Sequence, residues 1–139
     1  MFKTGAISSK FIAESIAKHQ SKTDIGAHNI FLGQVRADVI EDNAVIGIEY
    51  SAYEEMANKK FHEVREATFK KFNLSCMHIY HSLGEVKTGE ICLFVFVSSP
   101  RRKEVFKALK YVVEKIKSEV PVFGKEIFED ASHQWKVNN

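Results

Sequence analysis

The chain is poor in the residues that mark several classes of protein. It has two cysteines, two prolines and one tryptophan among 139 residues. Cys76 and Cys92 each lie in an apolar, strand-like run, which indicates small buried side chains rather than a disulfide or a nucleophile. Neither a Cys-x-x-Cys motif, a Cys/His cluster, a Walker loop nor a dinucleotide glycine motif is present. We therefore expect neither a metal site nor a cofactor.

An excess of charge of one sign is also missing. Twenty basic residues stand against 18 acidic ones, which gives a net charge of +2. This balance does not favour nucleic acid or a membrane surface as a partner, so any basic site must be local. No apolar run approaches the length of a membrane span, and residues 1–5 lack the apolar core of a signal peptide. We expect a cytoplasmic protein.

The apolar content of 45% is typical of a globular protein, and we expect one α+β domain over residues 1–139. Apolar alternation or continuity predicts strands at 2–7, 26–35, 44–50, 74–83, 91–97 and 122–128. The unbroken apolar run at 91–97 predicts a strand buried on both faces. Residues 38–43 should form a loop and residues 84–89 a turn. Because several strands follow one another like a meander, the sheet should be mostly antiparallel or mixed.

Two or three helices should cover this sheet. Ser8 and Ser9 are candidate N-caps for a helix that reaches about residue 18. Residues spaced three or four apart predict a helix over 52–72, with Tyr53, Ala57, Phe61, Val64 and Thr68 inward. A further amphipathic helix is predicted over 102–117, with Val105, Phe106, Leu109, Val112, Val113 and Ile116 inward. We expect Trp135 to pack back onto the domain.

Five cations are candidates for an anion site. Arg36 follows one predicted strand, and Arg101 and Arg102 follow another where a helix begins. Arginine forks hold phosphates and carboxylates well, and the free N–H groups of a helix start also favour anions. Lys117 ends that helix, and Lys125 lies in the next strand. We expect these cations near one end of the sheet. Each also has a purely structural alternative role. The arginines could be solvated surface residues, Lys117 could complement the helix dipole, and Lys125 could form an ion pair with Glu126.

The ordered series of motifs resembles the large, catalytic subunit of molybdopterin synthase. The matching pieces run from about residue 26 to the end, in the order and spacing of that family. They are residues 31–36, 48–57, 79–86, 97–102, 115–117, 120–123 and 125–126, with Trp135 near the end. One piece alone would be weak evidence, whereas the whole series is specific.

The resemblance implies an α/β hammerhead-type fold and a sulfurtransferase of molybdenum cofactor biosynthesis. The family converts cyclic pyranopterin monophosphate into the dithiolene molybdopterin. Its sulfur arrives as a thiocarboxylate on the C-terminus of a small ubiquitin-like subunit. The large subunit forms the central homodimer of a heterotetramer, and each active site borrows residues across the dimer interface.

The resemblance also assigns roles to residues. Arg36 matches a substrate-binding arginine, Arg102 matches the arginine of a His-Arg pair, and Lys117 matches the most important lysine. We expect Arg36, Arg101 and Arg102 to bind substrate, and Lys117 and Lys125 to be catalytic, with lysine assisting sulfur attack or stabilising developing charge.

This chain departs from the family in two places. Arg101 replaces the histidine of the His-Arg pair, so this position adds charge without acid–base chemistry. Gly124 stands where the second active-site lysine belongs, and Lys125 comes one position later. One position reverses the facing of a strand residue, so Lys125 reaches the site only if Gly124 permits a bulge. Otherwise Lys117 works alone.

Two rival functions remain open. A non-catalytic module would bind the ubiquitin-like tail without transferring sulfur, and the change at Gly124 motivates this alternative. A small nucleic-acid binder would use the basic residues Arg101, Arg102, Lys103, Lys107 and Lys110. The near-neutral net charge and the lack of a stacking motif argue against it.

Overall fold

The computed structural model describes residues 1–137, which form three helices and eight strands. In chain order they are β1 (Phe2–Thr4), α1 (Ser9–His19), β2 (Ala27–Gln34), β3 (Val39–Ile40), β4 (Asn43–Ala52), α2 (Glu54–Lys71), β5 (Cys76–Lys87), β6 (Ile91–Ser99), α3 (Arg102–Glu119), β7 (Val122–Phe128) and β8 (His133–Trp135). Strands and helices are mixed along the chain, which confirms the predicted α+β class.

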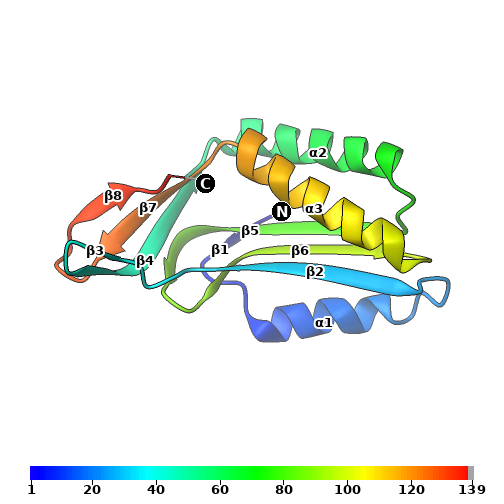
Figure 1. The fold of residues 1–139 in the computed structure, drawn as a ribbon, viewed down its shortest axis with the longest axis horizontal. Coiled ribbons are helices and arrows are strands. Elements are labelled where there is room, and N and C mark those ends of the chain that lie inside the picture. The colour runs from blue at the N-terminus through cyan, green and yellow to red at the C-terminus, as the bar shows by residue number, and fades with distance from the viewer. Residues whose placement is uncertain (138–139) are drawn as a thin grey trace.

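The strands form one sheet in the order β2-β6-β5-β4-β7-β8, with β1 beside β5 and β3 beside β4. Only the short β1–β5 pair is parallel among the strand pairs of residues 1–137, so the expectation of a mostly antiparallel or mixed sheet is confirmed. Figure 1 shows α2 and α3 covering one face of the β2-β6-β5 layer and α1 on the other. We call the part formed by β3, β4, β7 and β8 the wing.

The centre of the β2-β6-β5 layer is β6, which is buried as predicted. Every residue from Cys92 to Ser99 is buried. Side chains alternate across a strand, so β6 supplies both faces of the layer. Val95 and Val97 join the core beneath α2 and α3, whereas Phe94 and Phe96 join the core beneath α1.

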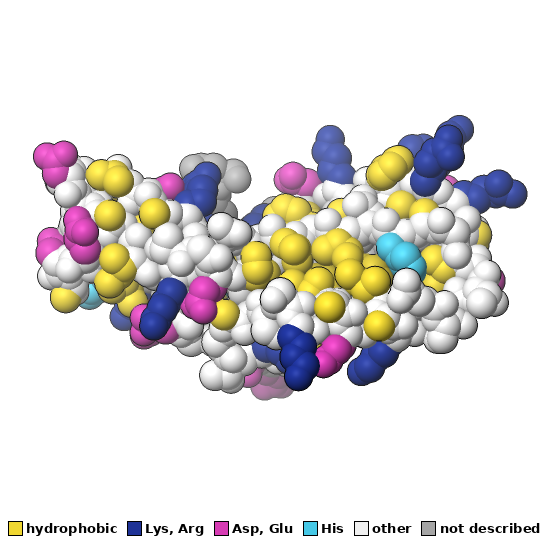
Figure 2. Space-filling model, turned by 90° about the horizontal axis from the view of Figure 1, so that it is seen from below, with side chains coloured by type: hydrophobic (Ala, Val, Ile, Leu, Met, Phe, Trp, Pro, Cys, Tyr) yellow, Lys and Arg dark blue, Asp and Glu magenta, His cyan; other side chains and the backbone are white. Residues whose placement is uncertain are grey.

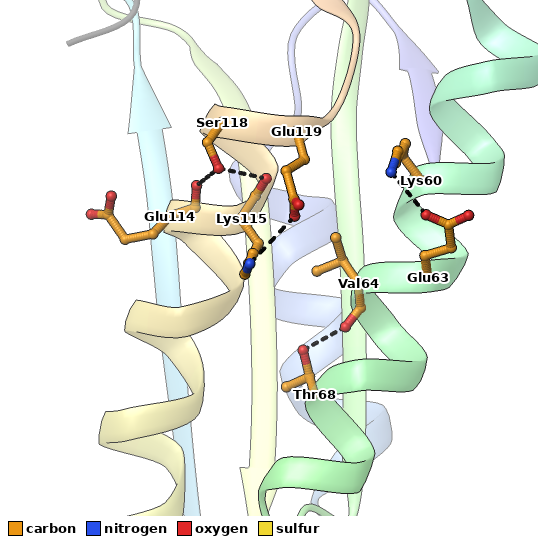
Figure 3. A network of polar contacts seen from close by, with 8 residues as sticks. All are labelled: Lys60, Glu63, Val64, Thr68, Glu114, Lys115, Ser118 and Glu119. Carbon is orange, nitrogen blue, oxygen red and sulfur yellow. Dashed lines mark hydrogen bonds and ion pairs between the residues drawn. The ribbon is translucent and has the colours of Figure 1, made fainter.

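Each helix presents an apolar stripe to the sheet. α1 begins at the predicted cap, where the Ser8 hydroxyl accepts from the Phe11 amide at 3.1 Å. α2 buries Ala57, Phe61, Val64 and Thr68. The polar contacts drawn in Figure 3, such as Thr68 to Val64 and Lys115 to Glu119, each stay within one helix. The apolar stripes of α2 and α3 pack on the sheet, and two hydrogen bonds add to this packing: Arg65 of α2 donates to the Met77 carbonyl, and the Asn29 side chain donates to the Val105 carbonyl of α3 at 3.3 Å.

Five local predictions are wrong. Tyr53, expected to face inward, is the exposed N-cap residue of α2. The expected loop at 38–43 contains β3, which pairs with β4 as a hairpin. The expected turn at 84–89 is mostly strand, because β5 continues past Gly84 to pair with β4 through Lys87. Phe106 and Trp135 are exposed rather than packed inward. Phe106 lies on the outer side of α3, whose opposite side meets the core, whereas all three residues of β8 are exposed.

One face of the molecule is richly apolar. Figure 2 shows hydrophobic side chains gathered over the part that contains the β2-β6-β5 layer, with Lys and Arg at its margins. Acidic side chains gather at the other end, which is the wing. In the interior on this side of the sheet, Phe11, Ile12 and Ile16 of α1 pack against the buried Phe94 and Phe96.

Candidate functional site

The candidate site is a small pocket at the carboxyl end of α3. Its walls come from β4, β5, α3, β7 and the segment after β8, and they comprise Tyr50, His81, Ile116, Lys117, Val120, Val122, Gly124 and Lys136. The cavity volume is about 30 Å³. This is roughly the volume of one water molecule, so a larger ligand must lie at the opening.

Lys117 reaches this pocket from the last turn of α3. The helix ends where the Val120 amide donates to the Ile116 carbonyl and the backbone becomes extended before Pro121. Although the residue as a whole is exposed, desolvation lowers the pKa of its ammonium, and repulsion from Lys136 lowers it further. The nearby Cys92 thiol opposes this shift. Lys117 is therefore closer to deprotonation than an ordinary lysine.

His81 forms the floor beside Lys117 and is a neutral imidazole. It is 4% exposed, and its Nδ1 lies 2.8 Å from the Ser82 carbonyl oxygen, to which it donates. Burial lowers the pKa of His81 to about 4, with a smaller contribution from Lys117 and an opposing one from the Ser82 bond. Its ring meets Tyr50 edge-on, with centroids 5.1 Å apart.

Tyr50 connects the pocket to the centre of the sheet. Its hydroxyl donates to the Cys92 sulfur at 3.3 Å, and Cys92 in turn donates to the Gly33 carbonyl at 3.4 Å. Burial, followed by the neighbouring Cys92, raises the pKa of Tyr50. The phenol therefore stays protonated and holds its position by a hydrogen bond.

A second lysine, Lys136, enters the same pocket from just beyond β8. Its amide donates to the Gly124 carbonyl at 2.8 Å, so Lys136 lies directly opposite Gly124 on the chain segment that runs beside β7. Gly124 in turn pairs with Tyr50 of β4. Residues directly opposite in antiparallel strands share a face, so Tyr50, Gly124 and Lys136 form one row across three strands. The glycine leaves the middle of that row open.

Lys125, a predicted catalytic residue, lies on the other face of β7. The β4–β7 register runs without a shift through Gly124 and Lys125, and its irregularity lies between Val45 and Gly47. The bulge that would turn Lys125 toward the site is therefore not at Gly124. Instead, the Lys125 ammonium lies 3.5 Å from the Glu49 carboxylate.

The predicted arginines lie outside the pocket. Arg36 follows β2, is exposed, and pairs with the Asp38 carboxylate at 3.3 Å. Arg101 and Arg102 begin α3 and border a hollow of about 640 Å³, together with Gly26, Asn73, Ser99, Pro100, Lys103 and Glu104. Arg101, the N-cap residue, makes no side-chain cap bond within the described chain. The first turn of α3 lines this hollow, and its free backbone N–H groups favour an anion there.

The expectation that these cations gather at one end of the sheet is wrong within a single chain. An α-helix rises about 1.5 Å per residue, so the Cα atoms of Arg102 and Lys117 are about 22 Å apart along α3. Arg36 lies at the Lys117 end, because the Val35 amide bonds to Glu90, just before β6 begins. Arg101 and Arg102 lie at the opposite end of β6.

Sequence patterns missed three residues of the pocket: Tyr50, His81 and Lys136. Tyr50 and His81 lie in segments correctly predicted as strands, so alternation could have placed them on an inner face. Lys136 gave no such signal, because its position depends on β8, which was not predicted.

Within residues 1–137, no helix is both long and apolar enough to cross a membrane.

Comparisons with known proteins agree with this structure. The family model described as "MoaE protein" matches residues 6–119, a range that includes Lys117 but not Gly124 or Lys136. The chain is 34% identical over 121 residues to the "Molybdopterin synthase catalytic subunit" of Emericella nidulans, covering 87% of this chain and 62% of that protein. It is 35% identical over 122 residues to the Bacillus subtilis protein of the same name, covering 88% and 76%. The chain thus spans about three fifths of the fungal relative.

Solved structures share the fold. Molybdopterin synthase from Staphylococcus aureus superposes with a TM-score of 0.83 at 28% identity, over 98% of this chain and 95% of that one. A complex of subunits 1 and 2 of molybdopterin-converting factor from Helicobacter pylori gives 0.81 at 19% identity, over 96% and 87%. The family match over most of the chain confirms the resemblance seen in the motifs: this chain belongs to the MoaE protein family.

Proposed function

We propose that this chain is the catalytic subunit of a molybdopterin synthase. It transfers sulfur from the thiocarboxylated C-terminus of a small ubiquitin-like subunit to cyclic pyranopterin monophosphate. The observation that carries the proposal is Lys117, a lysine that lines a pocket and whose pKa is lowered by desolvation. The chain is also about one third identical to relatives named as that subunit. The anionic tail and the anionic substrate both fit a site of clustered cations.

In this proposal Lys117 acts on the thiocarboxylate. Its ammonium binds the anionic sulfur and carbonyl oxygen, and it stabilises the charge that develops when sulfur attacks the substrate. Neutral His81 donates its single N–H to the Ser82 carbonyl, so its Nε2 can only accept a hydrogen bond and the ring adds no charge; stabilisation of negative charge is left to the lysines. The cavity admits little more than a water molecule, so the tail terminus lies at the pocket mouth.

Lys136 supplies the second cation of the proposed site, in place of Lys125. It lines the pocket with Lys117, whereas Lys125 is paired with Glu49 on the opposite face of β7. A Cβ atom at position 124 would lie 3.0 Å from Ile48 and 3.2 Å from Tyr50, so the pocket is closed to a side chain from β7 without local movement. A lysine arriving from the strand beyond avoids this crowding.

The substrate-binding arginines come from a second copy of the chain in this proposal. Arg102 lies about 22 Å from Lys117 along α3, too far for both to contact one small substrate. A homodimer that brings the α3 start of one copy to the pocket of the other would unite them. The small subunit then completes a heterotetramer, as a two-subunit complex is seen in the Helicobacter pylori structure.

The direct test is reconstitution. Purified chain is mixed with a thiocarboxylated small subunit and the cyclic precursor, and dithiolene product is measured. We expect turnover by the wild type and near-complete loss in Lys117→Ala, while tail binding persists. A well-folded complex that yields no product would refute the proposed activity, and wild-type rates in Lys117→Ala would remove its catalytic role.

A non-catalytic tail-binding module is the second candidate, and Gly124 favours it because the usual lysine position is vacant. Titration of the small subunit separates the two functions. Binding of the tail without any turnover would select the module.

A cytoplasmic location is part of the proposal. A thiocarboxylate is a reactive sulfur nucleophile, which reducing compartments preserve. Cell fractionation with an antibody to the chain would test the location.

A further inference from the structure

A second cluster of reactive side chains lies on the α1 face of the sheet. His19 is the last residue of α1, and Cys76 and His78 occupy alternate positions at the start of β5. Alternate strand residues face the same side, so both point toward α1. The possible ligand atoms of the three residues all lie within 4.8 Å of one another. Histidine nitrogen and cysteine sulfur are the ligands that zinc-like ions prefer.

The hydrogen bonds of His19 prepare it to bind a metal. Its Nδ1 lies 2.7 Å from the Ser15 carbonyl oxygen, which can only accept, so Nδ1 carries the proton. Nε2 of His19 therefore presents a lone pair, and it lies 2.9 Å from Nε2 of His78. Metal-binding histidines typically donate their other ring N–H to a backbone carbonyl in this way. Two imidazole nitrogens thus already converge on one point.

The surroundings combine an apolar wall with an open side. His19 and Cys76 are 8% and 7% exposed, and the Phe96 ring meets His19 edge-on with centroids 4.7 Å apart. His78 is only half-buried, which leaves an approach from solvent. The exposed Lys22 ammonium lies 3.0 Å from the Cys76 sulfur and competes there with any bound cation.

We propose that His19, Cys76 and His78 form a binding site for a divalent transition-metal ion of the zinc class. Zinc lies about 2.0–2.1 Å from nitrogen and about 2.3 Å from sulfur, so the three ligands need only small side-chain rotations to close on it. A water molecule from the open side completes the tetrahedron. The bound ion links the end of α1 to β5 and is independent of the proposed sulfur transfer.

Cobalt(II) titration of the chelator-treated full chain tests the site. We expect one ion per chain, a thiolate-to-cobalt charge-transfer band, tetrahedral d–d bands, and displacement by Zn²⁺. Cys76→Ala should lose the charge-transfer band, and His78→Ala should weaken binding at least tenfold, since even indirect partners of a metal are worth about 10–100-fold. Zn²⁺ should raise the melting temperature of the wild type but not of His78→Ala.

Three control variants sharpen the result. Cys92→Ala removes the other cysteine, and His62→Ala removes an exposed histidine of α2; both should keep cobalt binding. Lys22→Ala should tighten it, because the competing ammonium is gone. If His19→Ala fails to fold, the half-exposed His78 still carries the test. Absence of binding in the wild type, or a charge-transfer band that persists in Cys76→Ala, would overturn the site.

Discussion

His81 is held neutral by folding, and this makes stability depend on pH. The folded pKa of about 4 lies below the ordinary value of 6.5, so the unfolded chain binds more protons between these two values. Stability contributed by His81 is complete above about pH 6.5 and is lost as pH falls toward 4. The shift corresponds to about 3 kcal/mol of unfolding free energy at one buried group.

The measurement is chemical denaturation of wild type and His81→Asn across this range. Asparagine keeps a donor for the Ser82 carbonyl but does not titrate. We expect the variant to lose most of that pH-dependent component, while His62→Asn, at an exposed position, keeps it. Parallel pH profiles for wild type and His81→Asn would show that His81 does not titrate as described.

Sequence patterns reveal some of these residues and conceal others. Lys117 could be anticipated because it ends a clearly amphipathic helix just before Pro121. Residue type alone does not mark His81 as buried, since a histidine lies exposed at position 62; only the alternation of its strand points to an inner face. Lys136 depends on the pairing of β7 with β8, a contact between segments that one-dimensional periodicity does not record.

At the scale of elements, the β7–β8 hairpin sets which lysine faces the pocket. We predict that Lys136→Ala lowers turnover by at least tenfold, whereas Lys125→Ala, which breaks only the half-exposed pair with Glu49, stays within about threefold of wild type. Steady-state rates of the reconstituted enzyme provide the measurement.

The double variant Gly124→Lys/Lys136→Ala returns the lysine to β7. It should recover part of the lost activity, because both positions belong to the same cross-strand row. Recovery will be incomplete, since a side chain at 124 must displace Tyr50 and Ile48 by a few tenths of an ångström. Equal losses in Lys125→Ala and Lys136→Ala would contradict the assignment.

Element types were predictable where burial is one-sided or complete. The unbroken apolar run of β6 and the stripe of α2 correctly predicted a buried strand and a helix. The sequence predicts a turn from Gly84 to Gly89, but only Gly89 lies in the turn where the chain reverses direction between β5 and β6. Gly84 has φ of 83°, a conformation glycine adopts freely, and the strand passes through it to pair with β4.

At the scale of the whole molecule, the separation of Arg102 from Lys117 predicts complementation between subunits. Equal amounts of Arg102→Ala and Lys117→Ala chains, unfolded and refolded together, give about half mixed dimers. Each mixed dimer has one intact site and one doubly altered site, so we expect about a quarter of wild-type activity from two inactive parents.

The matched control mixes Lys117→Ala with Lys136→Ala. Both residues line the same pocket of one chain, so no mixed dimer has an intact site and activity should stay at the parental level. Failure of the first mixture, with dimers formed as judged by size, would place the arginine and lysine functions within one chain.

The path of β5 also divides the molecule into two cooperative parts. Its first half pairs with β6 and β1, and its second half, beyond Gly84, pairs with β4 of the wing. Amide hydrogen exchange should therefore protect the two halves to different degrees, with the β6-paired amides slowest. Local opening of the wing would carry Gly124 and Lys136 away from Lys117 while the rest of the sheet stayed folded. The proposed active site would then come apart before the whole protein unfolds.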